Sequence, residues 1–341
     1  MKKIKIAIAG ATGFVGLELL KILVNHPNVD IVHLYSQSNL NKSINFYSKS
    51  FKFKKKLPNV SMMKDHELEN IDVIFTALPH GEAHLISKKL NPKSVLIDLS
   101  ADFRINSKSI FEKWYKVPHL AMKEQKKSIY GLSEINRNFI KKSNFIACPG
   151  CYPTSVLLPL LPLVKKKLIN TKTIKADCKS GYSGAGKKTN DKKLYPNIDK
   201  NIAIYGAGQH RHMPEIDQEL SRALKKKVEI SFTPHLIPTF RGILSTIYLD
   251  LKKGVSIDNV YKCLVNFYKK EKFVNIYESI RMINTNDVLN TNNCNIAIYK
   301  NRFDNQIIIA SSIDNLIKGA AGQAVQNFNI RYGFKESLSI I

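Results

Sequence analysis

The sequence of 341 residues has few acidic residues, a single tryptophan and no long apolar run. Its 27 Asp and Glu stand against 53 Lys and Arg, so the formal net charge is +26. No apolar stretch approaches the ~18 residues of a membrane-spanning helix, which excludes an integral membrane protein of that type. The hydrophobic content of 44% suffices for packed cores, and the length predicts about two domains.

Arginine is scarce, and the positive charge comes mostly from lysines in twos and threes, as at 54–56, 165–167 and 225–227. Arginine is the residue that reads bases and clamps phosphates, and no nucleic-acid motif accompanies the lysines. We therefore expect a general attraction to anionic small molecules and no specific nucleic-acid partner. Nucleic-acid binding stays open as an alternative that depends on charge alone.

The five cysteines form no metal-binding pattern, and their odd number in a long chain indicates a reducing compartment, which predicts a cytoplasmic protein. A zinc site would need a second ligand pair beside Cys148 and Cys151, and the other three cysteines are scattered. We therefore expect no metal. A redox pair and a buried inert cysteine remain alternatives to a nucleophile.

The segment around Cys151 has the composition of a nucleophile turn. Residues 144–147 are typical of a buried strand end, and residues 155–158 of the first turn of a helix. Gly150 allows a sharp turn, and Pro153 suits the start of a helix. Cys151 would then lie at a helix N-terminus, where the partial positive charge favours thiolate over thiol. Two further prolines, at 159 and 162, are expected to break the helix early.

The N-terminus predicts a dinucleotide-binding unit. Basic residues before an apolar run could indicate a signal peptide, but Lys5 interrupts the run, so residues 4–9 are expected to form a strand. Glycines at spacing G-x-x-G-x-x-G follow, and then residues 17–23 with helical periodicity. This order is typical of a pyrophosphate loop. The residues expected to bind the cofactor are Gly10, Ala11, Thr12, Gly13, Phe14, Val15 and Gly16.

The second strand, residues 29–35, has no acidic residue after it; Ser36 and Ser38 follow instead. An NAD-binding domain usually has a carboxylate there for the ribose 2′-hydroxyl, and its absence favours NADP. The alternative is that Ser36 and Ser38 are ordinary polar residues of a loop and indicate no cofactor preference. Arg104 follows the strand at 95–98 and could hold a substrate phosphate, or form a structural ion pair with Asp98 or Asp102.

The second half of the chain contains a glycine-rich loop and a cluster of histidines. Residues 180–188 combine glycines, hydroxyls and lysines, which suits an anion cradle, although a flexible linker is possible. His210 and His212 precede an expected helix that begins near Glu215. An acid–base role beside Cys151 is preferred to zinc binding. Strands at 228–238 and 242–250 predict a second, mainly antiparallel sheet.

Six motifs in order make the chain similar to N-acetyl-gamma-glutamyl-phosphate reductases, relatives of aspartate-semialdehyde dehydrogenases. They are 10–16, 98–104, 149–154, 183–186, 210–216 and 314–322. The resemblance spans essentially the whole chain, and its cysteine and His-Arg-His-x-Pro-Glu motifs are specific.

The resemblance implies a Rossmann-type doubly wound sheet in residues 1–148, completed by a C-terminal helix within 314–341. Residues 149–313 would form a catalytic and dimerisation α+β domain, and the enzyme would be a homo-oligomer. Cys151 would attack an acyl phosphate and form a thioester that NADPH reduces. His210 or His212 would move protons, oriented by Glu215. Further implied contacts are Ser183, Gly184 and Asn315 to the cofactor, and Arg104, Lys187 and Arg211 to the substrate. An aspartyl- or aminoadipyl-phosphate reductase, or a non-enzymatic NADP-binding regulator, stays open.

Overall fold

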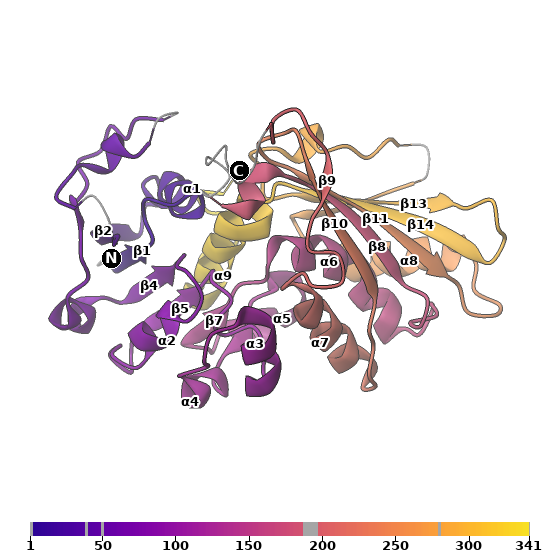
Figure 1. Ribbon diagram of the computed structural model, residues 1–341, viewed down its shortest axis with the longest axis horizontal. Helices are drawn as coiled ribbons and strands as arrows, with labels where there is room; N and C mark the ends of the chain where they lie inside the picture. Colours follow the sequence, from indigo (N-terminus) through magenta and orange to yellow (C-terminus); the bar gives the residue numbers. More distant parts are fainter. Residues whose placement is uncertain (1–2, 38–39, 49–50, 187–196, 279–280, 341) are drawn as a thin grey trace. The chain divides into compact units, whose positions relative to one another are not determined.

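A computed structural model describes residues 3–37, 40–48, 51–186, 197–278 and 281–340. The chain divides into two compact units (Figure 1): residues 1–149 with 320–341, and residues 150–319. The division falls one residue before Cys151. Among the described residues, no helix is both long enough and apolar enough to cross a membrane.

The first unit is built on a parallel sheet. Its strands are β1 (Ile4–Ala9), β2 (Val29–Tyr35), β3 (Val60–Ser61), β4 (Val73–Thr76), β5 (Val95–Asp98), β6 (Ile129–Tyr130) and β7 (Phe145–Ala147). They lie in the order β3-β2-β1-β4-β5-β7-β6, and every described pair is parallel. β4 and β5 are buried along their whole length, as apolar strands covered on both faces must be. The predicted doubly wound sheet is confirmed.

Helices connect these strands and cover the sheet: α1 (Phe14–Leu23), α2 (Glu82–Ser87), α3 (Lys108–Tyr115), α4 (Met122–Gln125) and α5 (Ser133–Ile140). The chain's last helix, α9 (Gly322–Tyr332), belongs to the same unit and packs against α1 and α5. Figure 1 shows α1 and α9 side by side. Buried amides tie α9 in place, since Gln323 and Asn327 both donate to the Gly131 carbonyl.

The second unit contains a mixed sheet. Its strands are β8 (Lys175–Gly181), β9 (Ala203–Ile204), β10 (Ser231–Ile237), β11 (Ile243–Asp250), β12 (Val274–Tyr277), β13 (Cys294–Lys300) and β14 (Gln306–Ile313). Their order is β12-β13-β14-β11-β8-β10-β9. Among the described strands, four neighbouring pairs are antiparallel and two are parallel, so the predicted mainly antiparallel sheet is confirmed.

Among the described residues of this unit, the α-helices are α6 (Cys151–Lys165), α7 (Met213–Leu224) and α8 (Ile257–Tyr268). α6 packs on β11 and β14, and α7 packs against α6. This packing brings the histidine motif, which precedes α7, to the helix that begins at Cys151.

The expectation that Pro159 and Pro162 break α6 is wrong, because the helix continues through both to Lys165. A proline inside a helix removes a hydrogen bond to the carbonyl four residues earlier. For Pro162 that carbonyl belongs to Leu158, and it accepts a hydrogen bond from the Tyr268 hydroxyl of α8 instead. Residues 152–164 are all buried, so tertiary packing outweighs the local cost.

Candidate active site

The nucleophile turn ends in a helix N-terminus, as its sequence predicts. Cys151 is the first residue of α6, and Gly150 is its N-cap, with φ −66° and ψ 158°. Gly150 has no side chain, so the helix receives no side-chain cap from it. Cys151 is half-buried. A thiol in this position faces the positive end of the helix dipole, which favours its ionised form.

The main chain of Gly150 is held on both sides. Its carbonyl accepts hydrogen bonds from the backbone N–H and the hydroxyl of Thr154, at 2.9 and 3.0 Å. Its own N–H donates to Glu215 Oε1 at 2.8 Å. The turn that carries Cys151 is therefore tied to its own helix and to α7.

Two glycines allow other groups to approach Cys151 closely. A Cβ placed on Gly150 would lie 2.5 Å from Nε2 of His212, so the imidazole lies directly against the main chain beside Cys151. A Cβ on Gly319 would lie 2.7 Å from the Cβ of Cys151. Neither position has room for a side chain. Thr154 and Gly319 lie within the motifs 149–154 and 314–322, but the sequence predicts no role for either of them, because both act through contacts that only the fold creates.

The two histidines have different surroundings. His210 Nδ1 accepts a hydrogen bond from the His212 backbone N–H at 3.2 Å, so one ring nitrogen of His210 is occupied locally. Its ring packs among aromatic groups, with centroids 5.4 Å from Tyr152 and 5.3 Å from Tyr205. Burial, with a contribution from Arg211, lowers the pKa of His210 to about 4. His210 is therefore neutral near pH 7, whereas His212 is the ring in contact with the nucleophile turn.

The glycine loop of the first unit has the geometry of a dinucleotide site. Gly10 has φ +85°, and a Cβ there would lie 2.2 Å from the Ala77 carbonyl oxygen. A Cβ on Gly16 would lie 2.2 Å from the Gly10 oxygen, so helix and strand pack too closely for any side chain. Gly13 is the N-cap of α1 and makes no side-chain cap. These residues fit a pyrophosphate at the helix N-terminus.

Ser36 lies beside this loop, as the strand order requires. Its hydroxyl is 3.0 Å from the Thr12 hydroxyl, and its N–H donates to the Ser61 carbonyl. The polar end of β2 is thus next to the glycine loop, where the adenosine ribose of a dinucleotide lies in this type of fold. Ser38 is outside the described residues.

Comparisons with known proteins agree with both units. Residues 5–143 match the family model "Semialdehyde dehydrogenase, NAD binding domain", and residues 151–315 match "Semialdehyde dehydrogenase, dimerisation domain". The chain is 44% identical to the N-acetyl-gamma-glutamyl-phosphate reductase of Clostridium beijerinckii, over 98% of this chain and 97% of that protein. It is 43% identical to that of Ehrlichia canis, over 99% and 97%. The chain belongs to the N-acetyl-gamma-glutamyl-phosphate reductase family.

A further relative has the same family name, and two solved structures share the fold. The chain is 40% identical to the probable chloroplastic N-acetyl-gamma-glutamyl-phosphate reductase of Arabidopsis thaliana, over 100% of this chain and 84% of that protein. Its fold resembles aspartate semialdehyde dehydrogenase II of Vibrio cholerae, with TM-score 0.72 and 16% identity over 98% and 99% of the two chains. It also resembles the aspartate semialdehyde dehydrogenase with NADP from Candida albicans, with TM-score 0.67 and 18% identity over 96% and 98%.

Residues that the family resemblance assigned to the cofactor in the second unit lie together. Asn315 donates from Nδ2 to the Ser183 hydroxyl at 2.9 Å and accepts from Gly242 N–H at 2.8 Å. A Cβ on Gly184 would lie 3.0 Å from the Ser180 hydroxyl. Their role toward a cofactor stays a prediction.

The three residues expected to bind the substrate differ in where they lie. Arg104 is buried in the first unit, where Nε donates to the Cys148 carbonyl at 2.7 Å and Nη2 to the Leu99 carbonyl at 2.8 Å. Arg211 is exposed in the second unit. Lys187 lies outside the described residues. The substrate roles of all three therefore stay predictions.

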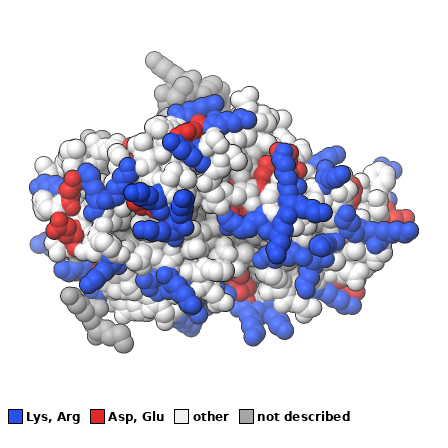
Figure 2. Space-filling model, turned by 90° about the horizontal axis from the view of Figure 1, so that it is seen from below, with Lys and Arg blue, Asp and Glu red and all other residues white. Residues whose placement is uncertain are grey.

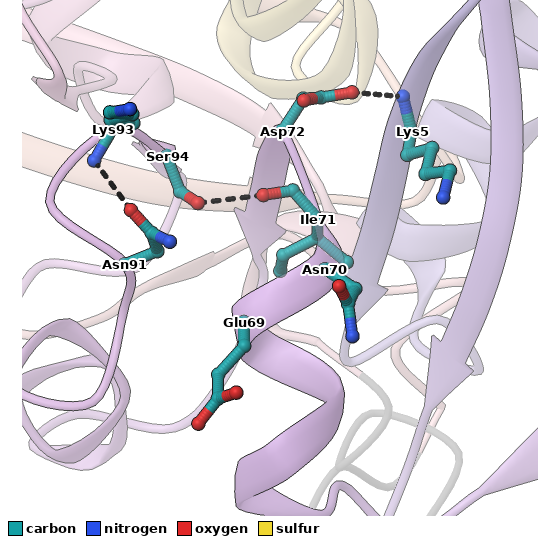
Figure 3. A pocket seen from close by; sticks show the side chains of 8 residues that line it. All are labelled: Lys5, Glu69, Asn70, Ile71, Asp72, Asn91, Lys93 and Ser94. Carbon is teal, nitrogen blue, oxygen red and sulfur yellow. Dashed lines mark hydrogen bonds between the residues drawn. The ribbon is translucent and has the colours of Figure 1, made fainter.

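One pocket of the first unit is lined by the residues that Figure 3 labels. Its residues come from the amino ends of strands: Lys5 N–H donates to Asp72 Oδ2 at 2.8 Å, and the Ser94 hydroxyl to the Ile71 carbonyl at 2.6 Å. Dinucleotides bind at the carboxyl ends of such strands. This pocket is therefore not the cofactor site.

Proposed function

We propose that this protein reduces N-acetyl-L-glutamyl 5-phosphate to N-acetyl-L-glutamate 5-semialdehyde with NADPH, releasing phosphate, as a step of arginine biosynthesis. The observation that carries the proposal is the 40–44% identity, along nearly the full chain, to reductases of that name. The position of Cys151 at a helix N-terminus beside His212 supports it.

The first chemical step is acyl transfer to Cys151. The thiolate attacks the carbonyl carbon of the acyl phosphate, a C–S bond forms, and a tetrahedral intermediate follows. The bond from that carbon to the phosphate oxygen then breaks, and phosphate leaves with the electron pair. The product is a thioester, which is more electrophilic toward hydride than a carboxylate. The partial positive charge at the start of α6 would stabilise the negative charge that develops on the tetrahedral intermediate.

The second step returns the thiolate. Bound NADPH would supply the hydride that reduces the thioester carbon. His212 protonates the resulting oxyanion to a hemithioacetal and then takes the hydroxyl proton back as the C–S bond breaks. The aldehyde leaves, and Cys151 is a thiolate again. His212 has this role, and His210 does not, because the His212 ring touches the nucleophile turn and His210 Nδ1 is held by the backbone.

NADPH is the proposed cofactor, because no carboxylate follows β2 and Ser36 lies in its place. The proposed assembly is a homodimer or homotetramer through the second unit, which matches the dimerisation family model. On one face of its sheet, Leu244 and Ile308 are only partly buried and Tyr248 is 40% exposed. A second copy could cover these side chains.

On the face that Figure 2 shows, Lys and Arg side chains lie in several separate groups, with few Asp and Glu among them. The proposed role of the net charge of +26 is to attract the anionic substrate and cofactor, and no specific nucleic-acid partner is proposed. The proposed location is the cytoplasm, in keeping with five free thiols.

The test is the reverse reaction. Purified protein is given NADP, phosphate and N-acetylglutamate semialdehyde, and NADPH formation is followed by absorbance. We expect phosphate-dependent NADP reduction. Parallel reactions contain aspartate semialdehyde or aminoadipate semialdehyde. A higher kcat/KM with either of these would overturn the proposed substrate, and no reaction with any of the three would overturn the proposed reaction class.

A further inference from the structure

Glu215 is a buried carboxylate aimed at the main chain of the nucleophile turn. It is the third residue of α7, is 0% exposed, and its Oε1 accepts the Gly150 N–H at 2.8 Å. His212 is the N-cap of the same helix. Residues three apart in a helix share a face, so one turn of α7 presents an imidazole and a carboxylate to the same glycine.

Burying a carboxylate costs free energy, so the buried position of Glu215 requires a compensating interaction. The turn at Gly150 explains why this interaction is needed. Gly150 must be glycine because the His212 ring occupies the space of its Cβ, but glycine is also the residue with the greatest backbone freedom. With no side chain, Gly150 can be held only through its peptide groups. Thr154 holds the carbonyl, and Glu215 holds the N–H.

We propose that Glu215 is a positioning residue, whose hydrogen bond to Gly150 N–H keeps the Cys151 side chain in line with the His212 ring. The proposal rests on the function proposed above and adds a residue that acts through the main chain of the nucleophile. It differs from the role expected from sequence, in which the charge of Glu215 orients a histidine. Under the present proposal the reach of the carboxyl group matters and its charge does not.

Two substitutions distinguish the effect of the length of the Glu215 side chain from the effect of its charge. Glu215→Gln keeps an acceptor oxygen at the same distance and removes the charge. Glu215→Asp keeps the charge but shortens the side chain by one methylene, which withdraws the acceptor from Gly150. Asp217 of the same helix is a matched control, because its Oδ1 accepts the Ile230 N–H at 3.1 Å, a comparable bond directed away from the turn.

The experiment measures the alkylation rate of Cys151 by iodoacetamide across pH, read by mass spectrometry, together with kcat and the KM for NADPH. We expect Glu215→Asp to lower kcat by about 10²-fold, the usual effect of a misplacement near 1 Å, and to slow alkylation, with KM for NADPH unchanged. Glu215→Gln should stay within a few-fold of the wild type in both. Asp217→Ala should lower the Tm and leave kcat and alkylation unchanged.

Three results would overturn the proposal: a fully active Glu215→Asp, a Glu215→Gln as impaired as Glu215→Asp, or an Asp217→Ala with the same alkylation defect. Because alkylation requires no substrate, these results are distinct from failure of the proposed function. That failure would appear as wild-type protein inactive toward the semialdehyde while its Cys151 still reacts with iodoacetamide.

Discussion

Replacing Gly150 by alanine tests whether the His212 ring must lie against the nucleophile turn. The backbone of Gly150 is in the extended region, which alanine adopts without strain. The nearest obstacle is the imidazole, because the new Cβ would lie 2.5 Å from Nε2 and 2.8 Å from both Cδ2 and Cε1 of His212. The substitution therefore acts first on the position of His212.

The magnitude follows from that distance. Carbon–nitrogen van der Waals contact begins near 3.5 Å, so the ring must withdraw by about 1 Å. A displacement of that size between reacting groups costs about 10²-fold in rate, which corresponds to about 2.7 kcal/mol of transition-state stabilisation. We expect kcat/KM for the semialdehyde to fall by that factor. NADPH binding, measured by fluorescence titration, should be unchanged because the glycine loop is untouched.

Gly254→Ala is the matched control. Gly254 has φ +77°, and its Cβ would have no atom within 4 Å, so this substitution strains the backbone without touching His212. It should cost about 1 kcal/mol in the free energy of unfolding and leave kcat/KM unchanged. If the Gly150→Ala protein is folded and has a wild-type kcat/KM, the inference that the His212 position governs catalysis is refuted.

Four further predictions follow from the site. Cys151→Ser should lose several orders of magnitude in turnover and still bind NADPH, while Cys148→Ser should be nearly silent; equal losses would indicate a redox pair instead. kcat/KM should be higher with NADPH than with NADH, and Ser36→Asp should shift the preference toward NADH; equal values in the wild type would reject the choice of cofactor. His212→Ala should lower turnover by about 10²–10⁴-fold and slow Cys151 alkylation, and His210→Ala should have the smaller effect; the opposite ranking would exchange their roles. Burial lowers the pKa of His210 to about 4, so between about pH 6.5 and 4 the unfolded chain takes up a proton that the folded protein does not. The free energy of unfolding therefore decreases as the pH falls through this range. The Tm of His210→Asn should depend less on pH than the Tm of the wild type, and an identical pH dependence would contradict the prediction.

Much of the fold could be predicted from local signals. Apolar runs of four to eight residues predict buried parallel strands, and β4 and β5 are buried throughout. Glycines between a strand and a helix predict the loop at 10–16, where two of them have no space for a Cβ. These features depend on residues close in sequence, so composition and spacing suffice to detect them.

The prediction for α6 failed because its outcome depends on a distant residue. Local chemistry predicts that Pro162 ends the helix, since it leaves the Leu158 carbonyl without its usual donor. The donor that replaces it is the Tyr268 hydroxyl, more than a hundred residues later. No pattern in the sequence indicates such a hydrogen bond. Local reasoning therefore favours a break in the helix at Pro162, and this prediction is wrong.

The choice between His210 and His212 shows the same limit at the site itself. The two lie two residues apart beside the same helix, and both can carry protons, so their spacing does not rank them. The ranking comes from Gly150, whose missing side chain admits one ring and not the other, and Gly150 is more than fifty residues from either. In the proposed mechanism, a glycine that the sequence predicts to form a turn therefore also admits the ring of His212, the proposed acid–base group. This dual role explains why the main chain there is held by both Thr154 and Glu215: a position that must lack a side chain can be kept rigid only through its peptide groups.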